Sequence, residues 1–379
     1  MFEIEKFHAG NEGKGYGYRF FIPEAINREW VWKTPVVNLL LEKAASRLGE
    51  LNSFARLVPN IDLFIQLHVA KEAVVSSRIE GTQTRMEEAI LPVEEIKPER
   101  RNDWLEVKNY IQALNLAIET LQKLPVSTRL LKQSHKTLLQ GVRGENKLPG
   151  EFRKSQNWIG GHSLADAVYI PPQHQYISDL MSDLEKFLNN DQIQVPYLIR
   201  IAIAHYQFET IHPFLDGNGR IGRLLITLYL VSTGILDQPL LYLSTYFEKD
   251  RTLYYDNLSQ VRTHSDLLQW VKYFLVGIEQ TASLAVQTLS EIISLKSGIE
   301  QKINTNFGRR SNSAGLLLDS LFQHPVTTVD QTAKICRLSF KAANDLIALM
   351  QEKGLLKETT GQGRNRIFIF EPYLKIFED

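Results

Sequence analysis

A twelve-residue segment from 212 to 223, HPFLDGNGRIGR, combines the side chains that phosphate chemistry requires. It places an imidazole, a carboxylate, a Gly-Asn-Gly turn and two arginines close together in the chain. The residues that follow are apolar with helical spacing, so we expect the segment to open a helix. The start of a helix offers free backbone N–H groups and the positive end of the helix dipole, and both attract phosphate. The segment therefore predicts a polyphosphate-binding loop with a base and a metal ligand beside it.

Each polar residue of this segment suits a particular role. Asp216 supplies a hard oxygen ligand of the kind that Mg²⁺ uses together with nucleotide phosphates. Arg220 and Arg223 lie three residues apart, so both project to one side of the new helix, where their guanidinium groups suit phosphate oxygens. His212 has an ordinary pKa of about 6.5, so near neutral pH much of it is free to accept a proton. One imidazole does not easily serve as base and nucleophile together, so we expect the nucleophile to be a substrate hydroxyl.

The two glycines of the Gly-Asn-Gly turn allow backbone angles that side chains forbid. For any single residue, a capped helix start with solvated arginines is the simpler explanation. That explanation does not account for all of the residues in this order. We therefore treat the whole segment as a candidate site for binding and cleaving a nucleotide.

The segment resembles the signature of the Fic family, HPFx[DE]GN[GK]RxxR, and fills every specified position. The resemblance implies a mainly α fold with a helical core that transfers AMP from ATP to a Ser, Thr or Tyr hydroxyl of a target protein. It implies that His212 is the general base and that Asp216 holds Mg²⁺. Related phosphotransferases have lysine at the position of Gly219, so glycine favours adenylyl transfer. The implied ATP-binding residues of the segment are Gly217, Asn218, Gly219, Arg220, Ile221, Gly222 and Arg223.

An upstream segment resembles the [ST]xxxE[GN] inhibitory motif of Fic proteins, with Ser76, Glu80 and Gly81 at the specified positions. A glutamate near the C-terminal end of a helix is disfavoured by the helix dipole, so it gains from an arginine partner. The resemblance implies that this partner is Arg223, which would then be withheld from the γ-phosphate of ATP. Because the motif is short and common, a chance occurrence is the alternative.

Residues 157–170 predict a small β-hairpin, since two short apolar runs flank a polar turn that contains glycines. A lone hairpin in a helical protein has free edges. It resembles the flap of the Fic family, which implies backbone pairing with an extended segment of the target protein and presentation of its hydroxyl. A loop packed over the core is the alternative.

Residues 241–262, downstream of the motif, are the candidate region for adenine recognition. Family members often carry a tyrosine pair here, which Tyr254 and Tyr255 match, and an aromatic face suits stacking on a base. We take Tyr255 and Lys249 as ATP-binding candidates, with helix packing as the alternative for both tyrosines. Some relatives have an asparagine where this chain has Arg262, so the polar contacts to the base stay open.

Length and composition agree with a soluble, cytoplasmic enzyme. A chain of 379 residues can bury a sizeable core in two or three domains. Lys+Arg and Asp+Glu number 43 each, so overall charge does not indicate nucleic acid or an anionic membrane as a partner. The single cysteine, Cys336, excludes an intrachain disulfide framework. The chain starts without a long apolar run, and residues 224–236 are fewer than the ~20 that a membrane-spanning helix needs, so we expect no membrane association.

The chain divides into three predicted parts. Residues 1–100 form a helical N-terminal region that carries the inhibitory motif, with apolar helical spacing over 37–48. A charged segment with proline over 94–102 marks the boundary. Residues 101–295 form the helical Fic core, and residues 305–379 form a separate module.

The C-terminal module resembles a winged helix. We expect Ser339 to be an N-cap between the second and third helices and Gly354 to end the third. Function does not follow from such a fold, and the third helix carries no cluster of arginines. A protein-contact or dimerisation role is therefore favoured over DNA binding. The expected helices cover 313–322, 328–336 and 340–353, and the expected strands cover 355–358 and 366–370, around a wing at 359–365.

These patterns predict a protein adenylyltransferase that uses ATP and Mg²⁺ and is held in check by its own N-terminal helix. Two alternatives stay open. The same site could run in reverse, with Glu80 orienting a water to remove AMP from a modified protein. The Fic core could instead only sense nucleotide, in a transcriptional regulator that acts through its winged helix. The sequence leaves open whether the protein is a homodimer.

Overall fold

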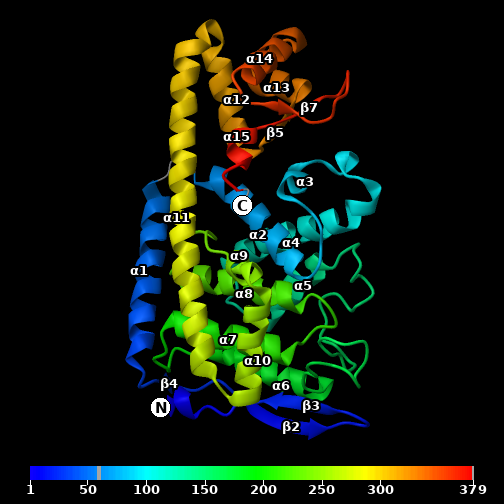
Figure 1. The fold of residues 1–379 in the computed structure, drawn as a ribbon, viewed down its shortest axis with the longest axis vertical. Coiled ribbons are helices and arrows are strands. Elements are labelled where there is room, and N and C mark those ends of the chain that lie inside the picture. Colours follow the sequence, from blue (N-terminus) through cyan, green and yellow to red (C-terminus); the bar gives the residue numbers. More distant parts are fainter. Residues whose placement is uncertain (58–60, 378–379) are drawn as a thin grey trace.

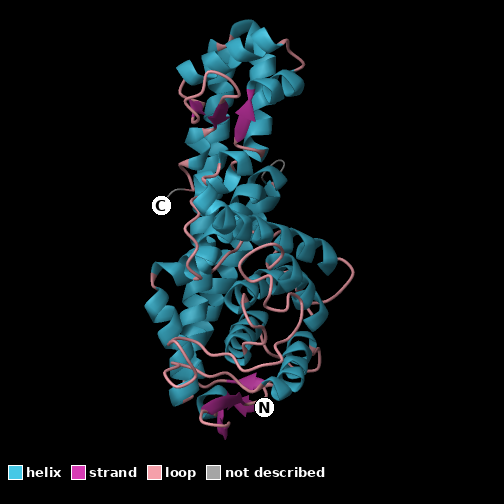
Figure 2. Ribbon diagram, turned by 90° about the vertical axis from the view of Figure 1, so that its right-hand side faces the viewer, coloured by secondary structure: helices cyan, strands magenta, loops and turns pink. Residues whose placement is uncertain are grey.

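The computed structural model describes residues 1–57 and 61–377, which form an elongated, mainly helical molecule (Figure 1). The strands are short and lie at the two ends of the long axis. At the lower end, β1 (Phe2–Glu3) pairs in parallel with β4 (Trp30–Val31). Beside them, β2 (Gly10–Lys14) and β3 (Arg19–Pro23) form an antiparallel hairpin. These small sheets cap one end of the helical core (Figure 2).

Four helices follow the N-terminal strands. α1 packs along the long helix α11, whose bounds are Leu267–Asn306, over much of the length of the molecule. α2 turns inward and contacts α4, α8 and α9. This path carries the end of α2, where Glu80 lies, to the start of α8. The bounds of the four helices are Pro35–Leu57 for α1, Asp62–Ile79 for α2, Met86–Ile90 for α3 and Arg101–Leu121 for α4.

The core is built around two helices that are buried on nearly all sides, as expected for helices without a polar face. Every residue of α7 from Leu198 to Ile211 is buried, and most of α8 is buried as well. The polar residues of this pair therefore need partners inside the protein. The helices of this part are α5 (Thr128–Leu138), α6 (Ile177–Asn189), α7 (Tyr197–Ile211), α8 (Asn218–Ser232), α9 (Ser244–Lys249) and α10 (Arg251–His264).

The C-terminal module stands at the upper end of α11 (Figure 1). The predicted core boundary at residue 295 falls inside this 40-residue helix, so a rigid rod rather than a loose linker joins core and module. The chain then returns along the module, and Phe377 packs edge-on against His68 of α2, with ring centroids 5.1 Å apart. The elements of the module are α12 (Ser311–Gln323), β5 (Val326–Thr328), α13 (Val329–Cys336), α14 (Phe340–Glu352), β6 (Lys357–Glu358), β7 (Ile367–Ile369) and α15 (Glu371–Leu374).

The expected helices and strands of the module are all present within a few residues of their predicted ends. Ser339 caps α14, because its side chain accepts a hydrogen bond of 3.3 Å from the N–H of Ala342. Gly354 follows α14 with a φ of +70°. Sequence patterns missed β5, which is only three residues long and pairs with β7, giving the sheet order β5-β7-β6.

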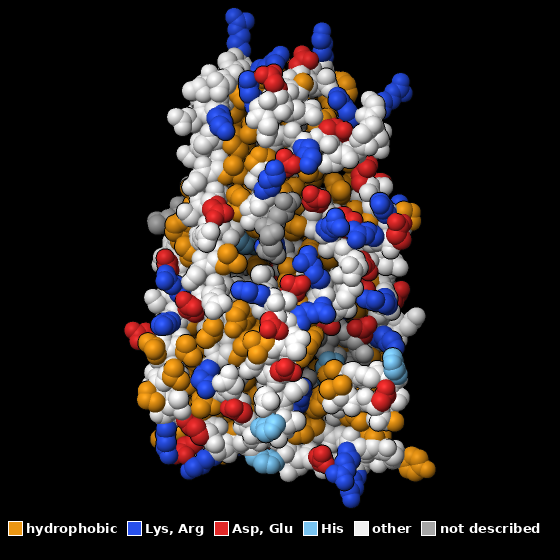
Figure 3. Space-filling view, in the orientation of Figure 1, with side chains coloured by type: hydrophobic (Ala, Val, Ile, Leu, Met, Phe, Trp, Pro, Cys, Tyr) orange, Lys and Arg blue, Asp and Glu red, His pale blue; other side chains and the backbone are white. Residues whose placement is uncertain are grey.

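Basic and acidic side chains are interspersed over the face shown in Figure 3, as the balanced composition predicts. Across the described ranges, every helix is too short or too polar to cross a bilayer.

Candidate active site

The loop between α7 and α8 is held by side chains from outside the motif. His212 ends α7 in the left-handed region, with a φ of +50°, which turns the chain away from the helix axis. The buried Arg153 donates from Nε to the carbonyl of His212 at 3.0 Å. Asn157 donates from Nδ2 to the carbonyl of Phe214 at 2.9 Å. These bonds fix the backbone at the proposed base and two residues after it.

Glycine is needed at two motif positions for different reasons. Gly217 precedes α8 with a φ of +75°, so it supplies the left-handed turn that the sequence predicts. The prediction of an unusual backbone angle is wrong for Gly219, which lies in α8 with helical backbone angles. A Cβ at Gly219 would lie 2.2 Å from Oε1 of Glu80, so here the requirement is space. The first N–H groups of α8 have no acceptor within the helix, and they are available to an anion.

His135 of α5 supports the start of α8 and was missed by sequence analysis. Its Nδ1 accepts a hydrogen bond from the N–H of Gly150 at 2.8 Å, so the proton is on Nε2, which donates to the carbonyl of Asp216 at 3.0 Å. The ring stacks on Phe214 with centroids 3.8 Å apart. Burial lowers the pKa of His135 to about 4, which keeps the ring neutral in this role.

His212 is a partly exposed residue whose Nδ1 atom is buried and has no hydrogen-bond partner among the described residues. Burial lowers its pKa to about 4, with a further contribution from the charge of Arg153. The sequence predicts an ordinary imidazole. The structure instead gives one that stays neutral throughout the physiological pH range, and so is able to accept a proton.

Arg220 forms a buried ion pair that the motif alone does not reveal. Its Nη1 donates to Oε2 of Glu106 in α4 at 2.9 Å, and its Nη2 lies 3.6 Å from Oδ1 of Asp216. Both Arg220 and Glu106 are almost fully buried. Arg220 therefore links the proposed metal ligand to the core, and its guanidinium is not free to serve phosphate alone.

Arg223 is held by the predicted inhibitory segment. Its Nη2 donates to Oε1 of Glu80 at 2.7 Å and to the carbonyl of Ser76 at 2.8 Å, and its Nε donates to Oγ of Ser76 at 2.9 Å. Glu80 is the C-cap of α2, and Gly81 follows with a φ of +101°. The structure thus brings together the three residues that sequence analysis paired from 140 positions apart. The charge of Arg223 keeps the pKa of Glu80 below its ordinary value, although burial opposes this.

Two further buried carboxyl groups lie close to this cluster. Glu72, on α2, accepts hydrogen bonds from Tyr110 at 2.8 Å and Ser244 at 2.6 Å, and burial raises its pKa to about 7. Burial also raises the pKa of Glu209 in α7 to about 7. The sequence offered one overlooked signal: Glu72 precedes Ser76 by four residues, so both lie on one face of α2.

The tyrosine pair divides between packing and the site. Tyr254 is buried, and its hydroxyl lies 2.9 Å from Nε2 of His205, as its packing alternative predicts. Tyr255 is half-exposed, and burial followed by the charge of Glu80 raises its pKa to about 12. Lys249 ends α9 and is exposed. Arg262 stacks on the ring of Tyr169 at 4.1 Å, and so contacts the predicted flap.

The two predicted runs of the 157–170 segment pair in antiparallel fashion, but only through one bridge, between Ile159 and Tyr169. The carboxylate of Asp166 accepts the N–H groups of His162 and Ser163 at 2.8 and 2.7 Å. These bonds form a local turn between the two runs. The end of the loop still pairs with another strand, because the N–H of Phe21 in β3 donates to Ile170 at 2.9 Å.

The residues fit Mg²⁺ held jointly with nucleotide phosphates. Within the described ranges, no group of three or more His, Cys, Asp or Glu side chains is placed to hold a metal ion. Asp216 offers a single, partly exposed carboxylate beside the start of α8. Mg²⁺ is commonly bound through one or two carboxylates plus substrate phosphates, which matches this arrangement.

Comparisons with known proteins agree with this geometry. The Fic/DOC family N-terminal model matches residues 38–119, and the Fic/DOC family model matches residues 125–230. The first match extends past the boundary predicted near residue 100. "Protein adenylyltransferase Fic" of Culex quinquefasciatus is 37% identical over 145 residues, which are 38% of this chain and 26% of that protein. The protein of the same name from Drosophila erecta is 27% identical over 190 residues, 48% of this chain and 35% of that protein.

Solved structures share the fold. A Fic family protein from Desulfovibrio desulfuricans G20 has a TM-score of 0.57 at 19% identity, covering 90% of this chain and 98% of that one. Fic-1 of C. elegans has a TM-score of 0.52 at 22% identity, covering 68% of this chain and 74% of that one. The chain spans about a quarter to a third of the length of the curated relatives it matches. On its two adjacent domain matches, its motif and its fold, the chain belongs to the Fic/DOC family.

Proposed function

We propose that this protein is an adenylyltransferase that moves AMP from ATP to a Ser, Thr or Tyr hydroxyl of a target protein. The observation that carries the proposal is the position of His212 at the end of α7, in the loop that places it beside Asp216 and the start of α8. The curated relatives that match the chain bear the name of this activity. The target protein would dock at the loop 157–170, and the reaction would take place in the cytoplasm.

The residues of the chain divide the work as follows. His212 accepts the proton of the attacking hydroxyl, which needs a base that is neutral at the working pH. The N–H groups at the start of α8, from Gly217 to Gly219, stabilise charge that develops on the α-phosphate. Arg220 and Arg223 flank the phosphate chain, whereas the prediction that Ile221 and Gly222 bind ATP is corrected: Ile221 is fully buried in the core, and Gly222 lies against α7. When bound to Asp216, Mg²⁺ would neutralise phosphate charge and orient the leaving pyrophosphate.

Glu80 holds the enzyme in an inhibited state. It occupies Nη2 of Arg223, the group that would otherwise hold the γ-phosphate, and its own charge repels that phosphate. Ser76 contributes by fixing the same guanidinium from the side, at 2.9 Å. ATP then lies in a pose unsuited to in-line attack. Release requires only that the end of α2 move away from α8.

The base assignment is tested with His212→Ala and with His174→Ala, a matched change of an exposed histidine. Transfer is followed with ATP labelled at the α-phosphate, and ATP labelled at the γ-phosphate distinguishes adenylyl from phosphoryl transfer. We expect His212→Ala to lose about 10²-fold or more in rate while nucleotide binding persists, and the control to be unchanged. Normal transfer by His212→Ala would refute the assignment.

The inhibitory assignment is tested with Glu80→Gly and Glu80→Gln. Self-modification should rise about tenfold or more in Glu80→Gly, because Arg223 becomes free for phosphate. Glu80→Gln removes the charge but keeps a hydrogen-bond acceptor, so its rate should lie between those of the native chain and Glu80→Gly. An unchanged or lower rate in Glu80→Gly would reject the inhibitory role.

A reverse reaction is the second candidate, since Glu80 is near enough to His212 for its charge to raise the pKa of that ring. In that reaction Glu80 would orient a water to remove AMP from a modified protein. Incubating a pre-modified target with Mg²⁺ alone distinguishes the two directions. Release of AMP by the native chain, abolished in Glu80→Gly, would favour the reverse reaction.

The C-terminal module, residues 305–379, is interpreted as a winged helix that contacts protein, including a second copy of the chain. DNA binding is tested with a salt-dependent gel shift of the full chain, because phosphate contacts make affinity fall steeply with salt. The absence of a shift at low salt would exclude a role in transcription through DNA.

A further inference from the structure

The last turn of α2 is held from α10, by a residue that belongs to neither sequence motif. Nη1 of Arg251, at the start of α10, donates to the carbonyl of Arg78 at 3.1 Å and to the carbonyl of Ile79 at 3.3 Å. These two carbonyls directly precede Glu80, which is the C-cap of α2. The last carbonyls of a helix lack partners within it and carry partial negative charge, so an arginine placed there stabilises the helix end.

The backbone of Arg251 is itself fixed by its own helix. Arg251 is the first residue of α10, and the side chain of Asp250 caps this helix by accepting the N–H of Leu253 at 2.9 Å. α10 in turn packs against α9 and α11. The guanidinium therefore reaches the end of α2 from the helical core, and not from a neighbouring surface loop.

The chain just after Glu80 is anchored as well, on α4. Gly81 turns the backbone with a φ of +101°, and the N–H of Gln83 then donates to Oδ2 of Asp103 at 2.7 Å. Glu80 thus lies between two backbone anchors, one from α10 and one from α4. Because its side chain is 32% exposed, packing alone does not determine where its carboxylate lies, and the anchored backbone matters more.

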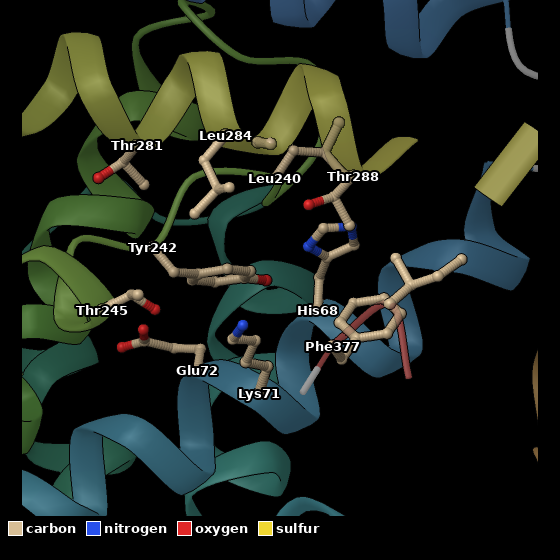
Figure 4. Close-up of a pocket in the computed structure, with 12 residues that line it drawn as sticks. His68, Lys71, Glu72, Leu240, Tyr242, Thr245, Thr281, Leu284, Thr288 and Phe377 are labelled. Carbon is tan, nitrogen blue, oxygen red and sulfur yellow. The ribbon is translucent and has the colours of Figure 1, made fainter. Parts of the chain in front are cut away.

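The earlier turns of α2 are held by other means. The ring of Phe377 lies beside His68 (Figure 4), and Glu72 accepts hydrogen bonds from Tyr110 and Ser244. Every residue from 72 to 77 is buried, and this continuous burial ends at Arg78. The last turn is therefore the part of α2 that can leave α8 without unpacking the core, and it is the part that Arg251 holds.

We propose that Arg251 is a positioning residue for inhibition, which holds the last turn of α2 so that Glu80 reaches Arg223. Without its two hydrogen bonds this turn frays more often, and the pair between Glu80 and Arg223 is closed for less of the time. A basic side chain at a helix C-terminus shifts such an equilibrium about two- to fivefold. The effect on activity rests on the proposed function, whereas the effect on α2 does not.

Self-modification of the full chain is measured for Arg251→Ala and Arg251→Lys, each alone and combined with Glu80→Gly. Arg251→Ala should raise the rate about two- to fivefold in the native background and leave it unchanged in Glu80→Gly, where no ion pair remains to be released. Arg251→Lys keeps a cationic donor, so its rate should lie closer to native. Arg56→Ala is the matched control, because this exposed arginine of α1 pairs with Asp237, past the C-terminal end of α8. An unchanged or lower rate in Arg251→Ala, or the same change with and without Glu80, would overturn the proposal.

Hydrogen exchange of backbone amides tests the same inference without relying on activity. Local opening sets the exchange rate, so Arg251→Ala should speed exchange about two- to fivefold over residues 76–84 and leave α8 unchanged. Arg56→Ala should alter neither region. Unchanged exchange over 76–84 in Arg251→Ala would refute the positioning role even if activity rose. If exchange rises there as expected but the chain modifies nothing, the proposed function fails and the hold of Arg251 on α2 stands.

Discussion

Two arginines of α8, three residues apart, each form an ion pair with a glutamate from another helix. The two ion pairs differ in how easily they can separate. Arg220 pairs with Glu106, whose side chain is 2% exposed and belongs to the core helix α4. Arg223 pairs with Glu80, whose side chain is 32% exposed and ends the N-terminal helix α2. The first pair cannot open without disturbing the core, whereas the second opens by movement of one helix end. Similar chemistry therefore serves structure in one place and suits a switch in the other.

We expect acidification to have the largest effect, because it destabilises the core around α8. His135 and His205 both contact the backbone of α8 or its preceding loop, and burial lowers their pKa values to about 4 and about 3. The unfolded chain therefore binds more protons, so stability is complete above pH 6.5 and is lost as pH falls toward 4. We expect a loss of about 2 kcal/mol per histidine between pH 6.5 and 5.

Urea unfolding at pH 7 and pH 5 measures this loss. The pKa of Glu80 is lowered by Arg223, so the ion pair between these two residues should persist over the same pH range. Glu72 and Glu209, whose pKa values burial raises to about 7, gain stability over the same range, so the histidine contribution is the difference in pH dependence between the native chain and His135→Gln. Equal pH dependence of the native chain and His135→Gln would contradict the burial of His135.

Charge removal at Glu106 should have the next largest effect. Glu106→Gln leaves Arg220 buried without its closest carboxylate, with Asp216 at 3.6 Å and the charge of Glu80 remaining nearby. Breaking a buried pair on one side costs about 3–5 kcal/mol, so we expect a loss near the lower value because glutamine keeps one hydrogen bond. Glu119→Gln, an exposed change on the same helix, is the control for α4. Equal unfolding free energies for both variants would show that the pair is not structural.

Removal of Glu80 should cost much less stability. Arg223 keeps its two hydrogen bonds to Ser76 at 2.8 and 2.9 Å, so its charge is not left without partners. Because solvent screens the partly exposed Glu80, Glu80→Gln should cost clearly less than the ~3–5 kcal/mol expected for breaking a fully buried pair. The variant should therefore gain activity while unfolding at nearly the native urea concentration. A loss as large as that of Glu106→Gln would remove the distinction between the two pairs.

The Glu80–Arg223 pair was predicted from the sequence and the Glu106–Arg220 pair was not, because both residues of only the first pair lie in recognisable short motifs. Ser76, Glu80 and Arg223 each occupy a position within a short pattern, and the structure brings them together. Glu106 lies on an amphipathic helix, where the pattern predicts that a glutamate is exposed to solvent. Its pairing depends on how α4 packs against α8, which residue spacing cannot show.

The same reason explains the other differences between prediction and structure. The helices of the C-terminal module have strong periodicity and caps, and their predicted positions are confirmed within a few residues. The apolar runs of the loop 157–170 pair only through Ile159 and Tyr169, and Asp166 shapes the turn between them by accepting the N–H groups of His162 and Ser163. Loop geometry is decided by such single side chains, and periodicity does not record them.

The smallest expected effect is the coupling between Gly219 and Glu80, which a double-mutant cycle measures. A Cβ at Gly219 would meet Oε1 of Glu80 at 2.2 Å, the flexible end of that side chain. In the native chain, Gly219→Ala should therefore weaken the pair with Arg223, which offsets the gain of up to about 1 kcal/mol that alanine brings inside a helix. In the Glu80→Gly background only Nη1 of Arg223, 3.0 Å from that Cβ, remains close, so the same substitution should stabilise the protein by part of that gain. The coupling is measured from four unfolding free energies. Identical effects of Gly219→Ala in both backgrounds would mean that Glu80 does not rest on α8, and the comparison between the two arginine pairs would fail with it.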